Sequence, residues 1–371
     1  MQKYELIINP ASRSGNGMRI WKEEIKPVLE ANKIPFNAHF SHKAGDVAVL
    51  SSSITGDYAK ENLPLRLIIL GGDGTFNEAL QGISSYDNMK IGYIPTGSSN
   101  DLARDLGIPK NPQQALNLIL DEKHVCYMDL GCVRTPDKTT YFAVSCGIGF
   151  DAAVCEEAMN SKIKDFFNRI KLGKLTYFGI AIKQLISAKK TACDLFLDDD
   201  NEPIHINRLL FTVSMIHRFE GGGFKFCPTA DCTDGRFELC VAGDVPKPVI
   251  LLALPTAFFG KHYMVPGIHA FHAEKITIKT STEHGYSAHV NLQYPIIAGT
   301  GNHIQFTITS HRYDFSAFKS GLRFLEILFQ NDFGFFLVAF LFVLCQYDIV
   351  KHGRFVGVIP SECPEADISI R

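Results

Sequence analysis

The sequence predicts an α/β domain built on a parallel sheet, followed by an antiparallel β-sandwich domain. Two observations support this prediction. Up to residue 126, strands that are apolar throughout alternate with helical segments, as in a parallel sheet covered on both faces. From residue 127 onward, short β-rich runs follow one another between turn residues, which favours an antiparallel sandwich or barrel. A chain of 371 residues is long enough for two such cores.

In the first region, residues 1–126, four predicted strands alternate with four helical segments. Buried strands are predicted for "YELIINP", "FNAHFS", "LRLIIL" and "KIGYIP". The helical segments between and after them are "MRIWKEEIKPVLEANK", "AGDVAVLSSSI", "TFNEALQGIS" and "NDLARDLG".

The second region, residues 127–311, contains a helical insert at 151–188 between its strands. The predicted strands include "YFAVSCGIGF", "CDLFLDDD", "IHINRLLFTVSMI", "RFELCVAG", "KITIKTS", "SAHVNLQYPIIAG" and "HIQFTITS". Residues 312–371 form an apolar tail that we expect to be helical. Its uncharged stretch Phe333–Tyr347 would be about 22 Å long as a helix, short of the roughly 30 Å of a bilayer core. This length favours a buried or interfacial helix.

Composition excludes several classes of protein. A net charge of −2 argues against a dedicated nucleic-acid partner. The ten cysteines form no CxxC pair, which indicates free thiols in a reducing cytosol rather than a disulfide framework or a zinc site. The N-terminus enters a strand directly without a signal-peptide pattern, so we expect a cytoplasmic protein.

Three polar, glycine-containing loops follow predicted strands. They are Asn9–Gly17, Gly71–Thr75 and Thr96–Arg104. A glycine-rich turn before a helix brings free N–H groups and the positive end of the helix dipole toward an anion. One such loop could equally be an ordinary capped turn, but three at the same edge of a parallel sheet favour a phosphate site. None matches GxxxxGK[ST] or GxGxxG.

The residues of these loops resemble the diacylglycerol kinase catalytic domain, in its bacterial lipid-kinase branch. The similar stretches are "NPASRSGNG", "GGDGTFNEAL" and "PTGSSNDLAR", continued by "CGIGFDAAV" and "GGGFKFCPTADCTDGRFELCVA". The resemblance covers roughly residues 1–310. It implies a nucleotide-binding α/β domain, a β-sandwich lipid-substrate domain and an active site in the cleft between them. It also implies transfer of the γ-phosphate of ATP to a lipid hydroxyl, with Mg²⁺.

The resemblance also implies which residues form the site. For the nucleotide these are Asn9, Pro10, Ala11, Ser12, Arg13, Ser41, Gly71, Gly72, Asp73, Gly74, Thr75, Asn77 and Ser98. Asp73, Asp101 and Asp129 would form an acidic network linked by water and Mg²⁺. Asp234, with the carbonyls of Asp231 and Arg236, would hold a structural Mg²⁺ through oxygen ligands. Considered without the resemblance, this last segment is a hairpin turn.

The sequence departs from the family at the expected catalytic acids. Where similar members carry Asp-Gly-Glu, this chain has Asn291, Leu292 and Gln293. An amide can hold a hydroxyl by hydrogen bonding but cannot take its proton near neutral pH. Three functions therefore stay open: an ATP-dependent lipid kinase, a weak or inactive lipid- or nucleotide-binding homologue, and an NAD kinase, whose fold also uses a GGDGT loop.

A basic segment is predicted to bring the protein to its lipid. Between Lys162 and Lys190 lie eight basic residues and one acid, Asp165, interleaved with apolar residues. Such a helix suits an anionic membrane surface, although a solvated helix face has the same pattern. We therefore expect a lipid substrate at the inner face of the membrane, peripheral attachment, no nucleic-acid partner, and an assembly compatible with a homodimer.

Overall fold

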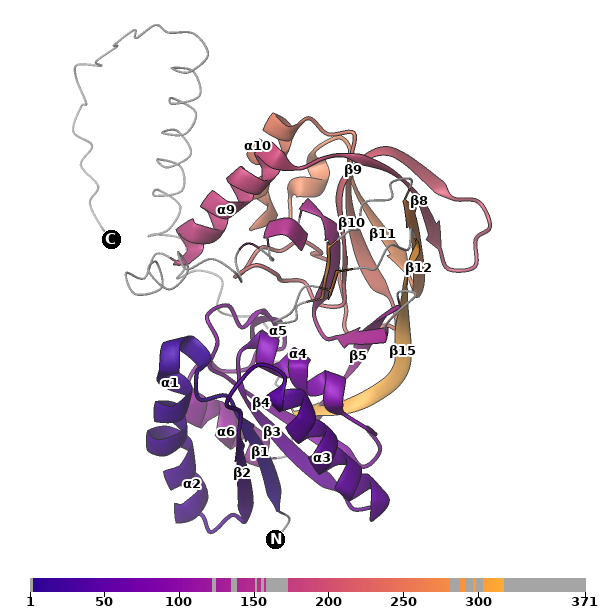
Figure 1. The fold of residues 1–371 in the computed structure, drawn as a ribbon. Coiled ribbons are helices and arrows are strands. Elements are labelled where there is room, and N and C mark those ends of the chain that lie inside the picture. Colours follow the sequence, from indigo (N-terminus) through magenta and orange to yellow (C-terminus); the bar gives the residue numbers. More distant parts are fainter. Residues whose placement is uncertain are drawn as a thin grey trace, which may run out of the picture. The chain divides into compact units, whose positions relative to one another are not determined.

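The computed structural model describes residues 3–121, 125–134, 139–150, 152–154, 157, 173–280, 287–290, 296–297 and 303–316 (Figure 1). The chain divides into a compact unit, Met1–Lys319, and a second unit, Ser320–Arg371. All the described residues belong to the first unit. Of the helical tail predicted at 312–371, residues 312–316 belong to strand β15 (His303–Ser316), and the rest lies outside the described residues.

The first region contains a four-stranded parallel sheet. Its strands are β1 (Tyr4–Ile8), β2 (Phe36–Phe40), β3 (Leu65–Gly71) and β4 (Met89–Pro95), in the order β2-β1-β3-β4. Its helices are α1 (Ser12–Ile20), the π-helical turn η1 (Trp21–Ile25), α2 (Lys26–Ala31), α3 (Asp46–Lys60), α4 (Asp73–Gly82), α5 (Asp101–Asp105) and α6 (Pro112–Asp121). The predicted alternation of strand and helix is confirmed.

Each face of this sheet packs on a different core, which explains why β1, β3 and β4 carry apolar side chains on both faces. Ile7 and Leu67 belong to one core with residues of α3 and α4. Leu6 and Ile68 point to the opposite face and pack with residues of α1, η1, α2 and α6. Because neighbouring strand residues face opposite sides, both faces need apolar side chains.

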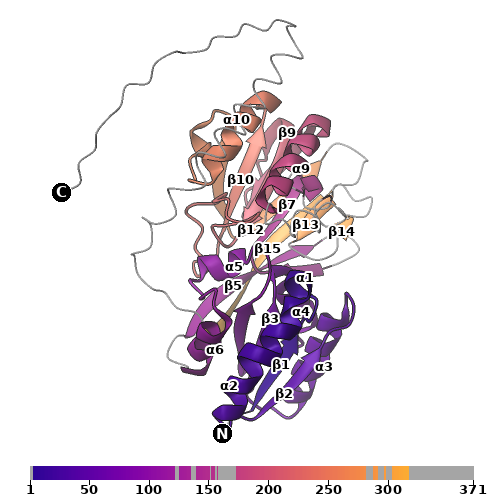
Figure 2. The same cartoon turned by 90° about the vertical axis from the view of Figure 1, so that its left-hand side faces the viewer.

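The second region is antiparallel, as predicted. Its strands are β5 (Val125–Arg134), β6 (Thr139–Phe142), β7 (Ser145–Gly149), β8 (Thr191–Leu197), β9 (Ile204–Met215), β10 (Phe237–Gly243), β11 (Ile268–Ala273), β12 (Lys275–Thr280), β13 (Ser287–Val290), β14 (Ile296–Ile297) and β15 (His303–Ser316). The helical elements are α9 (Gly173–Ser187), α10 (Lys247–Ala257) and the 3-10 turn η2 (His262–Met264), seen from a second side in Figure 2.

The long strand β15 joins the two regions. It pairs antiparallel with β12 and β5, and at Asp314 and Phe315 it pairs parallel with β4 of the first sheet. The hydrogen-bonded path therefore runs without a break from β14 to β2. β5 spans the predicted border at 126/127, and β15 extends five residues past the predicted border at 311/312.

Within the predicted helical insert 151–188, residues 173–187 form α9. No helix in the part of the chain that the structure describes has both the length and the apolar character needed to cross a membrane. The seven cysteines among the described residues are free thiols.

Candidate active site

The three predicted loops meet at the carboxyl ends of β1, β3 and β4. The Asn9 amide donates a hydrogen bond to the Thr75 hydroxyl at 2.9 Å, and this bond joins the first loop to the second. The hydroxyls of Ser12 and Thr96 lie 2.8 Å apart and join the first loop to the third. The convergence expected from the parallel topology is therefore present, with side chains that are 66 and 84 residues apart in the chain.

Glycine is required at this meeting point because the loops approach one another closely. A Cβ on Gly71 would lie 2.4 Å from the Thr75 side chain, and one on Gly97 would lie 2.6 Å from the Cα of Gly72. Gly74, at the first turn of α4, is different, because no atom lies within 4 Å of the position of its missing Cβ. The backbone there borders open space, next to the free N–H groups of the helix.

The first loop has an unusual backbone. Arg13, Ser14 and Gly15 follow one another in left-handed conformations, with φ of 49°, 58° and 92°. For residues other than glycine this conformation costs of the order of 1 kcal/mol each, and such strain gathers at ligand-binding loops. Arg13 is the cation that the sequence assigns to the nucleotide site.

A pair of carboxylates lies beside the loops, those of the buried Asp101 and the partly buried Asp73. The N–H of Asp101 donates to the Asp73 carboxylate at 2.8 Å, and the Tyr93 hydroxyl donates to its other oxygen at 3.4 Å. Burial, together with the charge of Asp101, raises the pKa of Asp73 to about 7. Burial also raises the pKa of Asp101, although its ion pair with Arg104 opposes this shift. The positive charge beside these two adjacent carboxylates does not balance their two negative charges. This imbalance favours binding of a cation or a proton.

The glycines at 221–223 bring the second region into contact with Asp101 of this pair. The Gly222 N–H donates to the Asp101 carboxylate at 2.8 Å. All three glycines have left-handed φ angles, of 64°, 87° and 116°. A Cβ on Gly223 would approach the Arg104 guanidinium to 2.8 Å. This triple-glycine loop is therefore fitted to the N-terminal half of α5.

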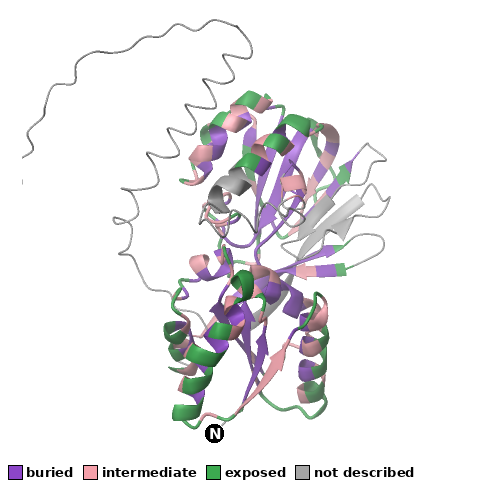
Figure 3. Cartoon of the chain, turned by 60° about the vertical axis from the view of Figure 1, so that its left-hand side comes forward, coloured by how far each residue is buried: buried purple, intermediate pink, exposed green. Residues whose placement is uncertain are grey.

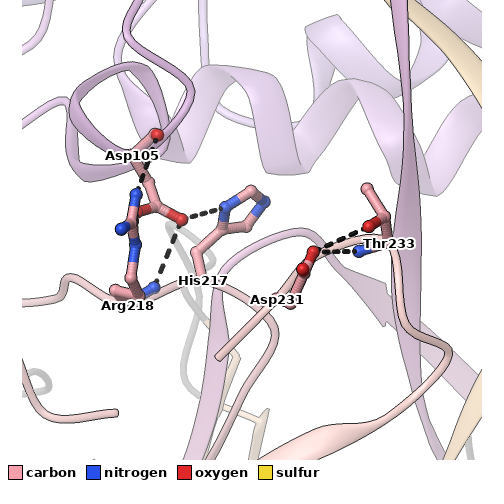
Figure 4. Close-up of polar contacts among 5 residues, drawn as sticks. All are labelled: Asp105, His217, Arg218, Asp231 and Thr233. Carbon is pink, nitrogen blue, oxygen red and sulfur yellow. Dashed lines mark hydrogen bonds and ion pairs between the residues drawn. The ribbon is translucent and has the colours of Figure 1, made fainter. Parts of the chain in front are cut away.

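The other end of α5 holds a third buried carboxylate, Asp105 (Figure 4). It accepts hydrogen bonds from His217 Nδ1 at 2.8 Å and from Arg218 Nε at 2.6 Å. Burial alone would raise the pKa of Asp105, but the hydrogen bond and charge of His217 and the charge of Arg218 outweigh it and lower the pKa. No local sequence pattern indicates this cluster, because the partners of Asp105 lie 112 and 113 residues away from it.

A cavity of about 480 Å³ lies beside this cluster. Its lining comes from both regions: Asp105, Leu106, Cys126, Tyr127, Asp129, Arg218, Ala230, Asp231, Cys232 and Thr233. Asp129, predicted to share a network with Asp73 and Asp101, lies in this cavity and accepts the Gly235 N–H at 2.8 Å. Burial raises the pKa of the Cys232 thiol to about 12, so this thiol is protonated at neutral pH.

The predicted structural metal loop is ordered as a turn. Asp231 accepts hydrogen bonds from the Thr233 N–H at 3.0 Å and from the Thr233 hydroxyl at 2.7 Å (Figure 4). Asp234 accepts the Arg236 N–H at 2.8 Å. Across the described residues, no group of three or more His, Cys, Asp or Glu side chains is arranged to hold a metal. The hairpin interpretation accounts for these contacts, and metal binding at this loop stays a prediction.

The remaining predicted residues have different surroundings. Ser41 is buried, and its N–H donates to the Ile8 carbonyl at 3.0 Å, whereas Ser98 is exposed. Asn77 is buried and accepts the Ala143 N–H at 3.3 Å, which ties α4 to the second region. Asn291 and Gln293 lie outside the described residues.

Comparisons with known proteins identify the family to which the sequence is similar. Residues 3–133 match the model of the diacylglycerol kinase catalytic domain, and residues 144–292 match that of the YegS C-terminal NAD kinase beta sandwich-like domain. The Bacillus subtilis protein YtlR, named as a lipid kinase, is 30% identical over 76% of this chain and 90% of its own length. A diacylglycerol kinase of Staphylococcus saprophyticus is 26% identical over 76% of this chain and 86% of its own.

Solved structures share the fold. A crystal structure from Bacillus anthracis matches 85% of this chain and 97% of its own, with a TM-score of 0.65 and 20% identity. A crystal structure of a diacylglycerol kinase from the same organism has the same coverage, with a TM-score of 0.61 and 17% identity.

Proposed function

Because this chain belongs to the family of the diacylglycerol kinase catalytic domain, we propose that it is an ATP-dependent lipid kinase that phosphorylates a diacylglycerol-like hydroxyl. The relatives reported above are named as a lipid kinase and a diacylglycerol kinase, and these names favour a lipid acceptor over NAD. The protein would act in the cytoplasm, attached peripherally to the inner face of the membrane.

The observation that carries this proposal is the convergence of three loops around the open backbone at Gly74. The Asn9–Thr75 and Ser12–Thr96 hydrogen bonds fix the loops, and the glycines remove side chains from their meeting point. Backbone N–H groups at the start of α4 would then bind phosphate oxygens, with Arg13 adding a positive charge. In phosphoryl transfer, such positioning and charge stabilisation supply most of the catalysis.

The carboxylates fit Mg²⁺ together with the nucleotide. Mg²⁺ usually keeps several waters and takes one or two carboxylates plus substrate phosphates, so a dense cluster of acids is not required. Asp73, which is partly buried, and Asp101, which is buried, are adjacent and short of positive charge, and they would hold the ion. The ion would neutralise charge on the phosphates. Arg104 and the Gly222 N–H keep Asp101 in place beside Asp73.

Asn291 and Gln293 favour a second candidate, a weak or inactive lipid- or nucleotide-binding homologue. With amides at both positions, the acceptor hydroxyl would be oriented but would lack a strong base. General-base catalysis typically increases the reaction rate by about 10²–10⁴-fold, so an enzyme without it would still transfer phosphate, but slowly.

The proposal is tested by transfer of labelled phosphate from ATP in mixed micelles. Diacylglycerol, a polyprenol, a sphingoid base and NAD are offered as separate acceptors. We expect label in diacylglycerol, and faster labelling by the double variant Asn291→Asp, Gln293→Glu. Labelling of NAD instead of any lipid would support an NAD kinase. Absence of lipid label in the wild type, with strong label in the double variant, would support the inactive homologue.

A further inference from the structure

Exposed apolar side chains gather on one part of the second region. Among the described residues, eight large apolar side chains are exposed, and four of them are Ile186, Leu252, Phe259 and Met264. They lie at the end of α9, on α10 and in the segment that follows α10. Single exposed apolar residues are ordinary, but a group of them marks a contact surface. We call these four residues the apolar cap.

The elements that carry the apolar cap contact one another. The Lys247 ammonium donates to the Ile186 carbonyl at 2.6 Å, which joins the start of α10 to the end of α9. The N–H of Phe259 donates to the Thr256 carbonyl at 3.0 Å, so the chain turns back directly after α10. Figures 1 and 2 both show α9 and α10 side by side, and Figure 3 shows exposed positions along α10.

The segments that carry the apolar cap contain basic residues but no acidic ones. Residues 166–193 and 245–273 contain no Asp or Glu, although the chain has 39 acids in 371 residues. The lysines whose side chains the structure describes there are Lys183, Lys189, Lys190, Lys247 and Lys261. Two acids from outside these segments lie close to them: Glu157 pairs with Lys183 at 2.5 Å, and the charge of Asp244 acts on Lys190. The apolar cap therefore lies within a surface that carries more positive than negative charge.

We propose that the apolar cap docks the protein onto an anionic lipid membrane, with its four side chains in the interface and its lysines facing lipid phosphates. The choice of a membrane as the partner rests on the proposed function. Apolar side chains at the lipid boundary combined with basic residues at the surface are the requirements for such binding. Docking against a second copy in a two-fold dimer would place the same lysines opposite one another, which disfavours that occupant.

The apolar cap is connected to the candidate active site through aromatic packing. Phe258, next to Phe259, stacks on Phe224 with ring centroids 3.9 Å apart. The Lys225 N–H donates to the Ala257 carbonyl at 2.8 Å. Phe224 directly follows the triple-glycine loop, whose Gly222 holds Asp101. A membrane bound at the apolar cap would therefore contact the segment after α10. That segment packs on Phe224, next to the triple-glycine loop that binds Asp101.

The test is sedimentation of the full chain with vesicles of phosphatidylcholine, with or without phosphatidylglycerol. We expect the wild type to bind the vesicles that contain phosphatidylglycerol. Leu252→Asp and Met264→Asp should each weaken this binding about tenfold, because a charge replaces an inserted side chain. Lys189→Gln with Lys261→Gln should weaken it in a salt-dependent way. The matched control is Val49→Asp on α3, a side chain 70% exposed and outside the cap, which should bind as the wild type does.

Phosphorylation of a short-chain, water-soluble diacylglycerol is measured in parallel and should not change in the cap variants. Equal vesicle binding by wild type and by the Leu252→Asp, Met264→Asp double variant would overturn the inference, as would a change in oligomeric state without a change in vesicle binding. Cap-dependent binding by a wild type that phosphorylates no lipid would support the inference and count against the proposed kinase. Phosphorylation without cap-dependent binding would overturn the inference alone.

Discussion

The two ends of α5 place buried aspartates in opposite surroundings. At the first end, Asp101 lies beside Asp73, and burial raises the pKa of both carboxyls. At the other end, Asp105 is held by His217 and Arg218, and its pKa is lowered although it is also buried. All three carboxylates are thus at least partly removed from water, and they differ in how much positive charge faces them.

This difference separates a ligand site from a structural connection. The charge of Asp105 is balanced without a ligand, because His217 and Arg218, which follow β9, both bind its carboxylate. The Asp73–Asp101 pair is not balanced, and such pairs are maintained where a bound cation or a proton transfer needs them. One short helix therefore ties the two regions together at one end and offers unbalanced charge to a ligand at the other.

The largest expected effect comes from neutralising the unbalanced pair. Asp73→Asn keeps the shape of the side chain and an acceptor for the Asp101 N–H, but it removes the charge that would hold Mg²⁺. We expect kcat/KM for phosphate transfer to fall about 10³-fold, the range seen when one preorganised electrostatic group is lost. The same variant should be more stable than the wild type above pH 7.

The sign of that stability change follows from the pKa of Asp73. Its pKa is about 7 in the folded protein against an ordinary value of 3.8, so the stability it contributes is complete below pH 3.8 and is lost as the pH rises to about 7. Urea unfolding of the variant and the wild type across this range measures the difference. Asp57→Asn, an exposed aspartate on α3, is the control. A variant that loses stability and activity together would contradict the distinction between the two ends of α5.

The balanced end should respond in the opposite way. Asp105→Asn leaves the buried His217 and the half-exposed Arg218 without their anion. Breaking a buried ion pair by removing one partner typically costs about 3–5 kcal/mol, and we expect about 3 kcal/mol here because Arg218 reaches solvent. The urea midpoint should fall accordingly.

The control for this prediction is an exposed pair of the same chemistry. Asp194 accepts from His205 Nδ1 at 2.7 Å, but both side chains are exposed, so Asp194→Asn should cost less than about 0.5 kcal/mol. Because the pKa of Asp105 is lowered from 3.8, its contribution is present above that pH and disappears as the pH falls below it. Equal destabilisation by both substitutions would show that the buried cluster is not a connection between the regions.

The sequence predicts the first end of α5 better than the second for a physical reason. Glycine-rich loops after strands are local patterns, and a parallel topology brings them to one edge of the sheet, so the meeting of the loops that carry Gly71, Gly72 and Asp73 with their neighbours could be predicted from the sequence. The pairing of Asp105 with His217 depends on how two regions pack, and no local pattern encodes it. The pairing of β15 with β4 of the first sheet is likewise not predictable. The pattern of apolar residues in a strand shows which face is buried but not which strands lie beside it.

The smallest expected effect, and the most specific to a ligand, comes from Gly74. Its missing Cβ would meet no protein atom within 4 Å, so Gly74→Ala should leave the folded protein undisturbed. A methyl group there would instead meet phosphate oxygens, and we expect KM for ATP to rise about tenfold, equivalent to about 1.4 kcal/mol.

Gly56→Ala is the matched control, because Gly56 lies inside α3 and an added Cβ would make only an ordinary contact with Ser84 at 3.7 Å. That substitution should raise the free energy of unfolding by up to about 1 kcal/mol through helix propensity and leave KM unchanged. The two glycines thus separate an effect on the fold from an effect on the ligand. A Gly74→Ala variant with unchanged KM and kcat would mean that the phosphates bind elsewhere. The unbalanced pair at Asp73 and Asp101 would then lack the neighbouring phosphates with which it is proposed to share a cation.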